Sequence, residues 1–189
     1  MIEWVFIKRE AGRGMKYNDL RRHVEPFDIF LFSGKGIISR GIQFATGSKW
    51  SHIGISLRLP QYDWNLLYES TTMSNMDDLV TGRPMKGVQL TYLSDRINNY
   101  NGDVAWLPIV GPKKDWMVKS ANSFVREYAG TPYEENILEL IASAIDIVDI
   151  FTEEDSSSLF CSELSMMLLR KVGICKQGEP ANEYTPSDF

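Results

Sequence analysis

The sequence predicts an α+β fold, in which helices pack on an antiparallel sheet. Three observations lead to this class. The chain has 189 residues, the usual length of one domain. Segments with the alternating or continuously apolar pattern of strands occupy much of its first half. Apolar residues at helical spacing dominate most of the second half.

The composition is that of a folded protein. Hydrophobic residues make up 43% and charged residues 24%, which rules out wholesale disorder. The 20 basic and 25 acidic residues give a net charge of −5, with a pI near 5.1. This balance argues against a nucleic-acid partner, because backbone binders are basic. Two cysteines are too few for a disulfide scaffold.

The first residues lack the pattern of an export signal. Their apolar stretch is short and contains Glu3 and Lys8. The most apolar segment, 136–151, falls short of the ~18 residues of a spanning helix and carries three acids. We therefore expect a cytoplasmic protein without a transmembrane segment, whose cysteines are free thiols. A short chain of this kind is also compatible with a viral or phage origin.

The first elements are predicted from short apolar runs. Residues 1–24 carry no clear pattern and are treated as an N-terminal extension to a domain over residues 25–189. The run FDIFLF predicts a buried strand over 27–32, closed by Ser33-Gly34. Isoleucines at helical spacing predict a helix over 36–45.

A hairpin is predicted next. Residues 51–57 alternate, so that Ile53 and Ile55 share one face of a strand and His52 lies on the other. After a turn-rich stretch, 66–70 forms the returning strand. Further strands are expected over 87–93 and 104–110, and helices over 113–129, 136–151 and 161–172.

The helix over 136–151 has two interpretations. Its acidic residues form a narrow stripe on an otherwise apolar surface, which is typical of a largely buried helix. The alternative is an interfacial helix that contacts lipid or a lipid-like substrate.

His52 and Glu69 form the first candidate site pair. If the two strands place them directly opposite each other, their Cβ atoms lie ~4.5–5.5 Å apart, close enough for a hydrogen bond. A carboxylate on one imidazole nitrogen raises the basicity of the other. The alternative is a pair that only joins two strands, and a register slip of one residue would separate the two side chains.

Cys161 is the candidate nucleophile. It falls in the first turn of the helix over 161–172, where unpaired N–H groups and the helix dipole favour a thiolate. The alternative is a small buried side chain. Cys175, just past the helix end, is interpreted as structural. A cysteine at a helix start, a histidine and a carboxylate are the parts of a cysteine-nucleophile triad.

Several short motifs occur together in a recognisable order. They are FDIFLF (27–32), ATGSKWSHIGISL (45–57), YES (68–70), GTPY (130–133), FCSEL (160–164) and TPSDF (185–189). This set resembles the circularly permuted branch of the NlpC-type papain-like cysteine peptidase superfamily, which includes the YiiX-like proteins. The resemblance covers roughly residues 25–189. The sequence departs from it at Phe27, where glycine is usual.

The resemblance implies a circularly permuted papain-like fold and a set of site residues. Cys161 would be the nucleophile, His52 the base and Glu69 the residue that orients His52. Tyr133 would lie near the substrate or the oxyanion, the alternative being an ordinary half-buried aromatic residue. The implied activity is that of a cysteine hydrolase or peptidase, which cleaves an amide bond through an acyl-enzyme.

Two other functions stay open. The same triad could serve a lipid acyl hydrolase or an acyltransferase, and the fold could also be kept by a non-catalytic binding module. The expected partner is therefore a peptide, amide or acyl-lipid substrate. No cofactor or metal is expected, because the sequence lacks both a phosphate-binding loop and the close-spaced ligand pairs of zinc sites.

Overall fold

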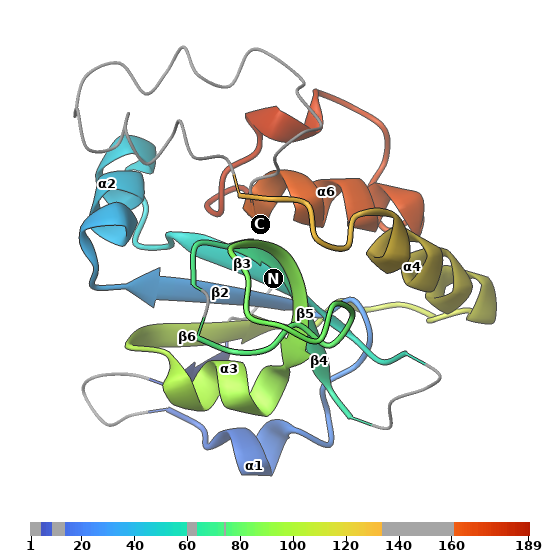
Figure 1. Cartoon of the computed structure of the whole chain (residues 1–189), viewed down its shortest axis with the longest axis horizontal. Helices are drawn as coiled ribbons and strands as arrows, with labels where there is room; N and C mark the ends of the chain where they lie inside the picture. Colours follow the sequence, from blue (N-terminus) through green and yellow to red (C-terminus); the bar gives the residue numbers. More distant parts are fainter. Residues whose placement is uncertain (1–4, 9–13, 60–63, 74, 134–160) are drawn as a thin grey trace.

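A six-stranded antiparallel sheet forms the centre of the molecule (Figure 1). The computed structural model describes residues 5–8, 14–59, 64–73, 75–133 and 161–189. The strands are β1 (Val5–Lys8), β2 (Ile29–Gly34), β3 (His52–Leu57), β4 (Leu66–Thr71), β5 (Gly87–Tyr92) and β6 (Gly102–Leu107). Their order across the sheet is β1-β6-β2-β3-β4-β5. The helices are α1 (Tyr17–Leu20), α2 (Ile37–Thr46), α3 (Leu93–Asn99), α4 (Asp115–Glu127) and α6 (Cys161–Lys171), with a 3-10 turn at Ala181–Glu183. The predicted α+β class, with helices on an antiparallel sheet, is confirmed.

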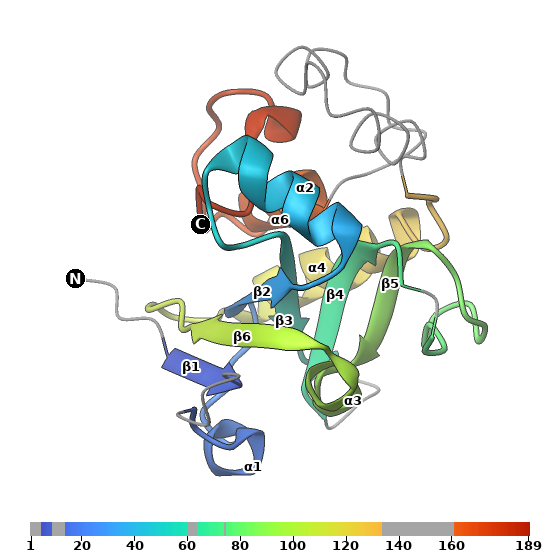
Figure 2. The ribbon, with the colours of Figure 1, turned by 90° about the vertical axis from the view of Figure 1, so that its left-hand side faces the viewer.

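Both faces of the sheet are covered by helices (Figures 1 and 2). Ile53 and Ile55 of β3 belong to the larger apolar core, under α4 and α6. Leu67 of β4 belongs to a second core, which also contains residues of α1 and α3. All six residues of β3 are buried for this reason. The alternation along β3 therefore separates two buried faces, whereas in a half-exposed sheet it separates core from solvent.

The strands and helices predicted over the described residues are present, with ends that agree within three residues. The helix predicted over 136–151 lies outside the described residues. Helix α3 is an addition, because the sequence pattern assigned residue 93 to the end of a strand. This helix starts directly after β5, with no loop between them. None of the described helices has the length and apolar character needed to cross a membrane.

The predicted register of the hairpin is wrong by two residues. Strands β3 and β4 pair Ile55 with Tyr68 and Leu57 with Leu66, and the same register continued puts Glu69 opposite Gly54. Arg58 and Asn65 close the connection, with a 2.9 Å hydrogen bond from Arg58 Nη2 to Asn65 Oδ1. His52 and Glu69 are thus diagonal neighbours. Because side chains repeat every two residues along a strand, both still lie on the same face.

The first 24 residues contribute to this fold. Strand β1 pairs with β6 and extends the sheet at its edge. Leu20 of α1 and Val24 are buried in the second core. The described part of the predicted extension is therefore packed with the rest of the fold.

Phe27 adopts the backbone conformation of a glycine. Its φ is +75°, in the left-handed region, and its side chain is fully buried. A non-glycine residue there costs of order 1–3 kcal/mol. The following residue anchors the turn: the Asp28 carboxylate accepts hydrogen bonds from Trp106 Nε1 and from the N–H of Ile109, both at 2.9 Å. Phe27 therefore takes a backbone conformation that glycine adopts more readily than any other residue.

Candidate active site

His52 and Glu69 are hydrogen-bonded despite the shifted register. His52 is the first residue of β3, and its Nε2 lies 2.5 Å from Oε2 of Glu69 in β4. The Glu69 side chain is completely buried. Since Nε2 is engaged by the carboxylate, Nδ1 is the ring nitrogen left for a second partner.

Arg96 of α3 is the second partner of the Glu69 carboxylate. Its Nε lies 2.7 Å from Oε1 and 3.1 Å from Oε2 of Glu69, and the residue is only 1% exposed. The guanidinium also lies 5.2 Å from the ring centre of Phe32 and 5.3 Å from that of Tyr100. A third donor, Gln89 Nε2, lies 3.3 Å from Oε1. Glu69 is therefore held from three sides.

Arg96 could not be predicted as a site residue from the sequence pattern. Arginine is rarely buried, so an arginine on a short segment after a strand is normally interpreted as exposed. The one usable signal is the spacing of Leu93 and Ile97, which is that of one apolar helix face beside Arg96.

The charges around Glu69 keep it ionised. Burial by itself raises the pKa of this carboxyl, but the positive charges of Arg96 and His52 outweigh burial and lower the pKa to about 2. A carboxylate thus faces His52 over the whole physiological pH range.

Cys161 is the first residue of α6, as predicted, and its side chain meets His52. Helices α6 and α3 pack on opposite faces of the sheet. Cys161, the first residue of α6, can therefore contact His52 because His52 is the first residue of β3, at the edge of these two faces. Burial by itself lowers the pKa of His52, but the negative charges of Cys161 and Glu69, and the hydrogen bonds that His52 makes to both side chains, raise it to about 9. A pKa this high favours an imidazolium at His52 at neutral pH, beside the Cys161 sulfur.

A small cleft opens beside His52, with a volume of about 70 Å³. Ile38 and Ile42 of α2 form one wall, and Tyr133 lies on another. Tyr133 is 8% exposed, and burial together with the charge of Cys161 raises the pKa of its hydroxyl. The structure therefore brings all four predicted site residues together. Cys175 lies elsewhere, and both cysteines are free thiols.

Comparisons with known proteins identify a similar fold. No family model matches the sequence, and no curated protein matches it. The crystal structure of the metalloprotein YiiX from Escherichia coli O157:H7 has a TM-score of 0.57 and 18% sequence identity. The match covers 82% of this chain and 69% of that chain. Among the residues described here, no group of three or more His, Cys, Asp or Glu side chains is arranged to hold a metal ion. The likeness is one of fold: this chain has a YiiX-like α+β architecture.

Proposed function

We propose that this protein is a papain-like cysteine hydrolase that acts on an amide bond. Cys161 is the nucleophile, His52 the general base and acid, and Glu69 the residue that orients His52. One observation carries the proposal: the thiol at the first turn of α6 meets an imidazole whose Nε2 is bonded to a buried carboxylate at 2.5 Å. The order His, Glu, Cys along the chain supports the circularly permuted NlpC-type assignment as part of this proposal.

The reaction follows from these positions. The Cys161 sulfur attacks the acyl carbon and forms a tetrahedral intermediate, whose oxyanion accepts hydrogen bonds from N–H groups at the start of α6. His52 protonates the leaving amine, the C–N bond breaks, and the acyl group stays on sulfur. His52 then takes a proton from water, which attacks the thioester and releases the acid.

Tyr133 and Arg96 support this chemistry in different ways. The raised pKa of Tyr133 keeps its hydroxyl protonated, as a hydrogen-bond donor to the oxyanion must be. Arg96 touches no reacting atom. It balances the charge of Glu69, so that the buried carboxylate orients His52 without an unpaired negative charge in the core.

Alkylation tests the proposed nucleophile. We expect iodoacetamide at about pH 6 to modify Cys161 much faster than Cys175, because burial raises the pKa of the Cys175 thiol, which lacks an imidazolium partner. His52→Ala removes the preference if the pair is real. Peptide mass spectrometry measures both sites in one sample, so Cys175 is an internal control. Equal rates at Cys161 in the parent and in His52→Ala contradict the triad and favour a binding module.

A second candidate activity uses the same residues on acyl lipids. The observation that favours it is the apolar surface of α2, where Ile37 is 85% exposed and Phe44 is 90% exposed, next to Ile38 and Ile42 in the cleft. An acyl chain is a suitable ligand for such a wall. Hydrolysis of p-nitrophenyl acetate and octanoate separates the two activities. Phe44→Ser lowers the rate on octanoate alone if α2 binds the acyl chain, and leaves both rates unchanged if it does not.

A further inference from the structure

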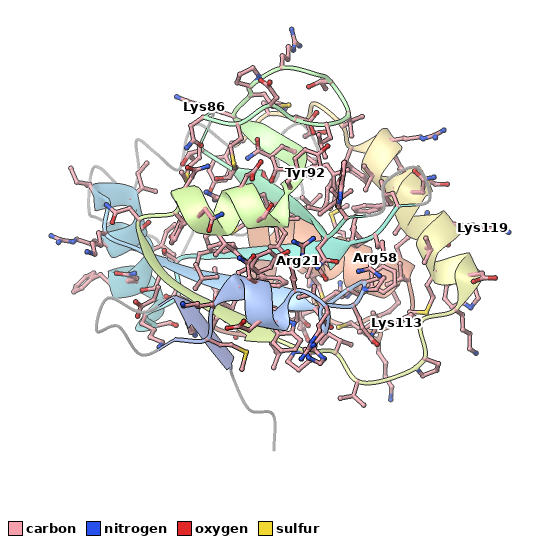
Figure 3. All side chains as sticks on the ribbon, turned by 90° about the horizontal axis from the view of Figure 1, so that it is seen from below. Arg21, Arg58, Lys86, Tyr92, Lys113 and Lys119 are labelled. Atoms are coloured by element: carbon pink, nitrogen blue, oxygen red, sulfur yellow. The ribbon has the colours of Figure 1, made fainter. Side chains whose placement is uncertain are left out.

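A second cleft lies at the opposite end of the β3–β4 hairpin. It consists of two adjoining hollows of about 340 and 410 Å³ that share Arg21, Trp64 and Asn65 as lining residues. Residues of α1, the residues before β4 and the start of α3 line them. Figure 3 views the molecule from this side. His52 begins β3 and Arg58 follows its end. At ~3.3 Å per residue, the two clefts are therefore about 20 Å apart. No residue that lines this cleft also lines the small cleft beside His52.

One side of the second cleft is cationic. Arg21 and Arg58 both line the part of this cleft that has a volume of about 410 Å³. Asn65 joins the two segments: its Oδ1 accepts from Nη2 of Arg58 at 2.9 Å, and its Nδ2 donates to the backbone carbonyl of Arg21 at 2.7 Å. Among the described residues, neither guanidinium is ion-paired with a carboxylate. Two arginines that line one cleft, on a protein of net charge −5, indicate a site for an anion.

The other side is aromatic. Trp64 is 55% exposed, and its ring meets that of Tyr92 edge to face, with centroids 5.4 Å apart. Both rings line the cleft. A tryptophan surface left open beside arginines is suited to a planar ring. Ser94 and Asp95 complete the wall, and both accept hydrogen bonds from hydroxyl or amino groups.

We propose that this cleft binds a mononucleotide, with its base against Trp64 and Tyr92 and its phosphate between Arg21 and Arg58. The volume suits a ligand of this size. Arginine matches phosphate geometry with paired N–H donors, and each arginine supplies one of these forks. The ribose hydroxyls then face Asp95. The proposal concerns binding alone and does not depend on the hydrolase chemistry.

Isothermal titration calorimetry of the full chain tests this site with three probes: AMP, adenosine and inorganic phosphate. We expect saturable binding of AMP, and binding of each fragment weaker by about tenfold or more, because each lacks one half of the contacts. Arg58→Gln and Trp64→Leu each weaken AMP binding by about tenfold. Lys119→Gln and Lys86→Gln are the matched controls. They remove the same charge from exposed positions outside the cleft and change the affinity less than about twofold (Figure 3).

Three results overturn the proposal. One is the absence of saturable AMP binding. Another is phosphate binding as tight as AMP binding with no effect of Trp64→Leu, which identifies a simple anion site. The third is a loss of AMP affinity in Lys119→Gln as large as that in Arg58→Gln, which identifies nonspecific electrostatic attraction. The same titrations are repeated with Cys161→Ser, which removes the proposed nucleophile. AMP binding should be unchanged in this variant, because binding at this cleft does not require the thiol, so the result does not depend on the hydrolase proposal.

Discussion

Arg96→Met tests whether the buried guanidinium is what permits an ionised glutamate in the core. Methionine keeps the length and apolar character of the arginine stem and packs well against aromatic rings, here Phe32 and Tyr100. The substitution therefore removes the charge and the donors while it preserves most of the packing. It leaves the Glu69 carboxylate with His52 and Gln89 as its side-chain partners.

Arg96→Met should lower the free energy of unfolding strongly, because both Arg96 and Glu69 are buried. The Arg96 and Glu69 side chains are 1% and 0% exposed, which excludes the small effects of surface pairs. Breaking a buried pair from one side costs about 3–5 kcal/mol. Burial raises the pKa of Glu69, and the charge of Arg96 is the largest of the effects that lower it to about 2, so the loss of this charge should fall in that range. For a domain of this size, a loss of about 3–5 kcal/mol should lower the thermal unfolding midpoint by about 6–20 °C.

Urea and thermal unfolding, followed by circular dichroism, measure this loss. Arg126→Met is the matched control, because Arg126 is exposed on α4 and its replacement should change stability by less than about 0.5 kcal/mol. Glu69→Gln combined with Arg96→Met removes both charges. We expect the double variant to be more stable than the sum of the single losses predicts.

A midpoint for Arg96→Met within about 2 °C of the parent would refute this reasoning. It would mean that the Glu69 carboxylate is neutral or hydrated in the folded protein. Additive losses in the double variant would equally contradict a direct charge pair between Arg96 and Glu69.

Three other perturbations test the site. In the folded protein the pKa of His52 is raised from 6.5 to about 9. Protonated His52 therefore stabilises the fold fully below pH 6.5, and this stabilisation is lost as the pH rises through 9. In urea unfolding, the difference in unfolding free energy between the parent and His52→Asn should shrink over the same pH range. Gly54→Ala puts a Cβ 2.9 Å from Leu67 and should lower the free energy of unfolding by about 1–3 kcal/mol. Gly36→Ala is the control and should change it little, because nothing lies within 4 Å of its Cβ. Equal thermal unfolding midpoints for the two variants would contradict the close approach of Gly54 to Leu67. Tyr133→Phe should lower the kcat of the proposed hydrolysis by about 10²-fold with little change in KM, and an unchanged kcat rules out Tyr133 as an oxyanion donor.

The proximity of His52, Glu69 and Cys161 could be predicted because its main signals are local. Alternation along β3 assigns His52 to one face, and the same parity assigns Glu69 to the same face of β4. The register error of two residues preserved that parity, so the pair was found in spite of it. Cys161 was placed at a helix start by the apolar pattern that follows it, which ends at Gly173 with a φ of +72°.

The sequence alone determined which side chains of β3 and β4 share a face and, within two residues, where α2, α4 and α6 begin, because both follow from repeats of two or about four residues along one chain. Only the tertiary structure decided that Arg96 joins Glu69, that α2 stands over the cleft, and that Trp64 lies with Arg21 and Arg58. Those contacts join segments whose separation in sequence carries no periodic signal. They arise where packing brings α1, α3 and the β3–β4 hairpin together, and burial then makes a charge pair such as Arg96 with Glu69 obligatory.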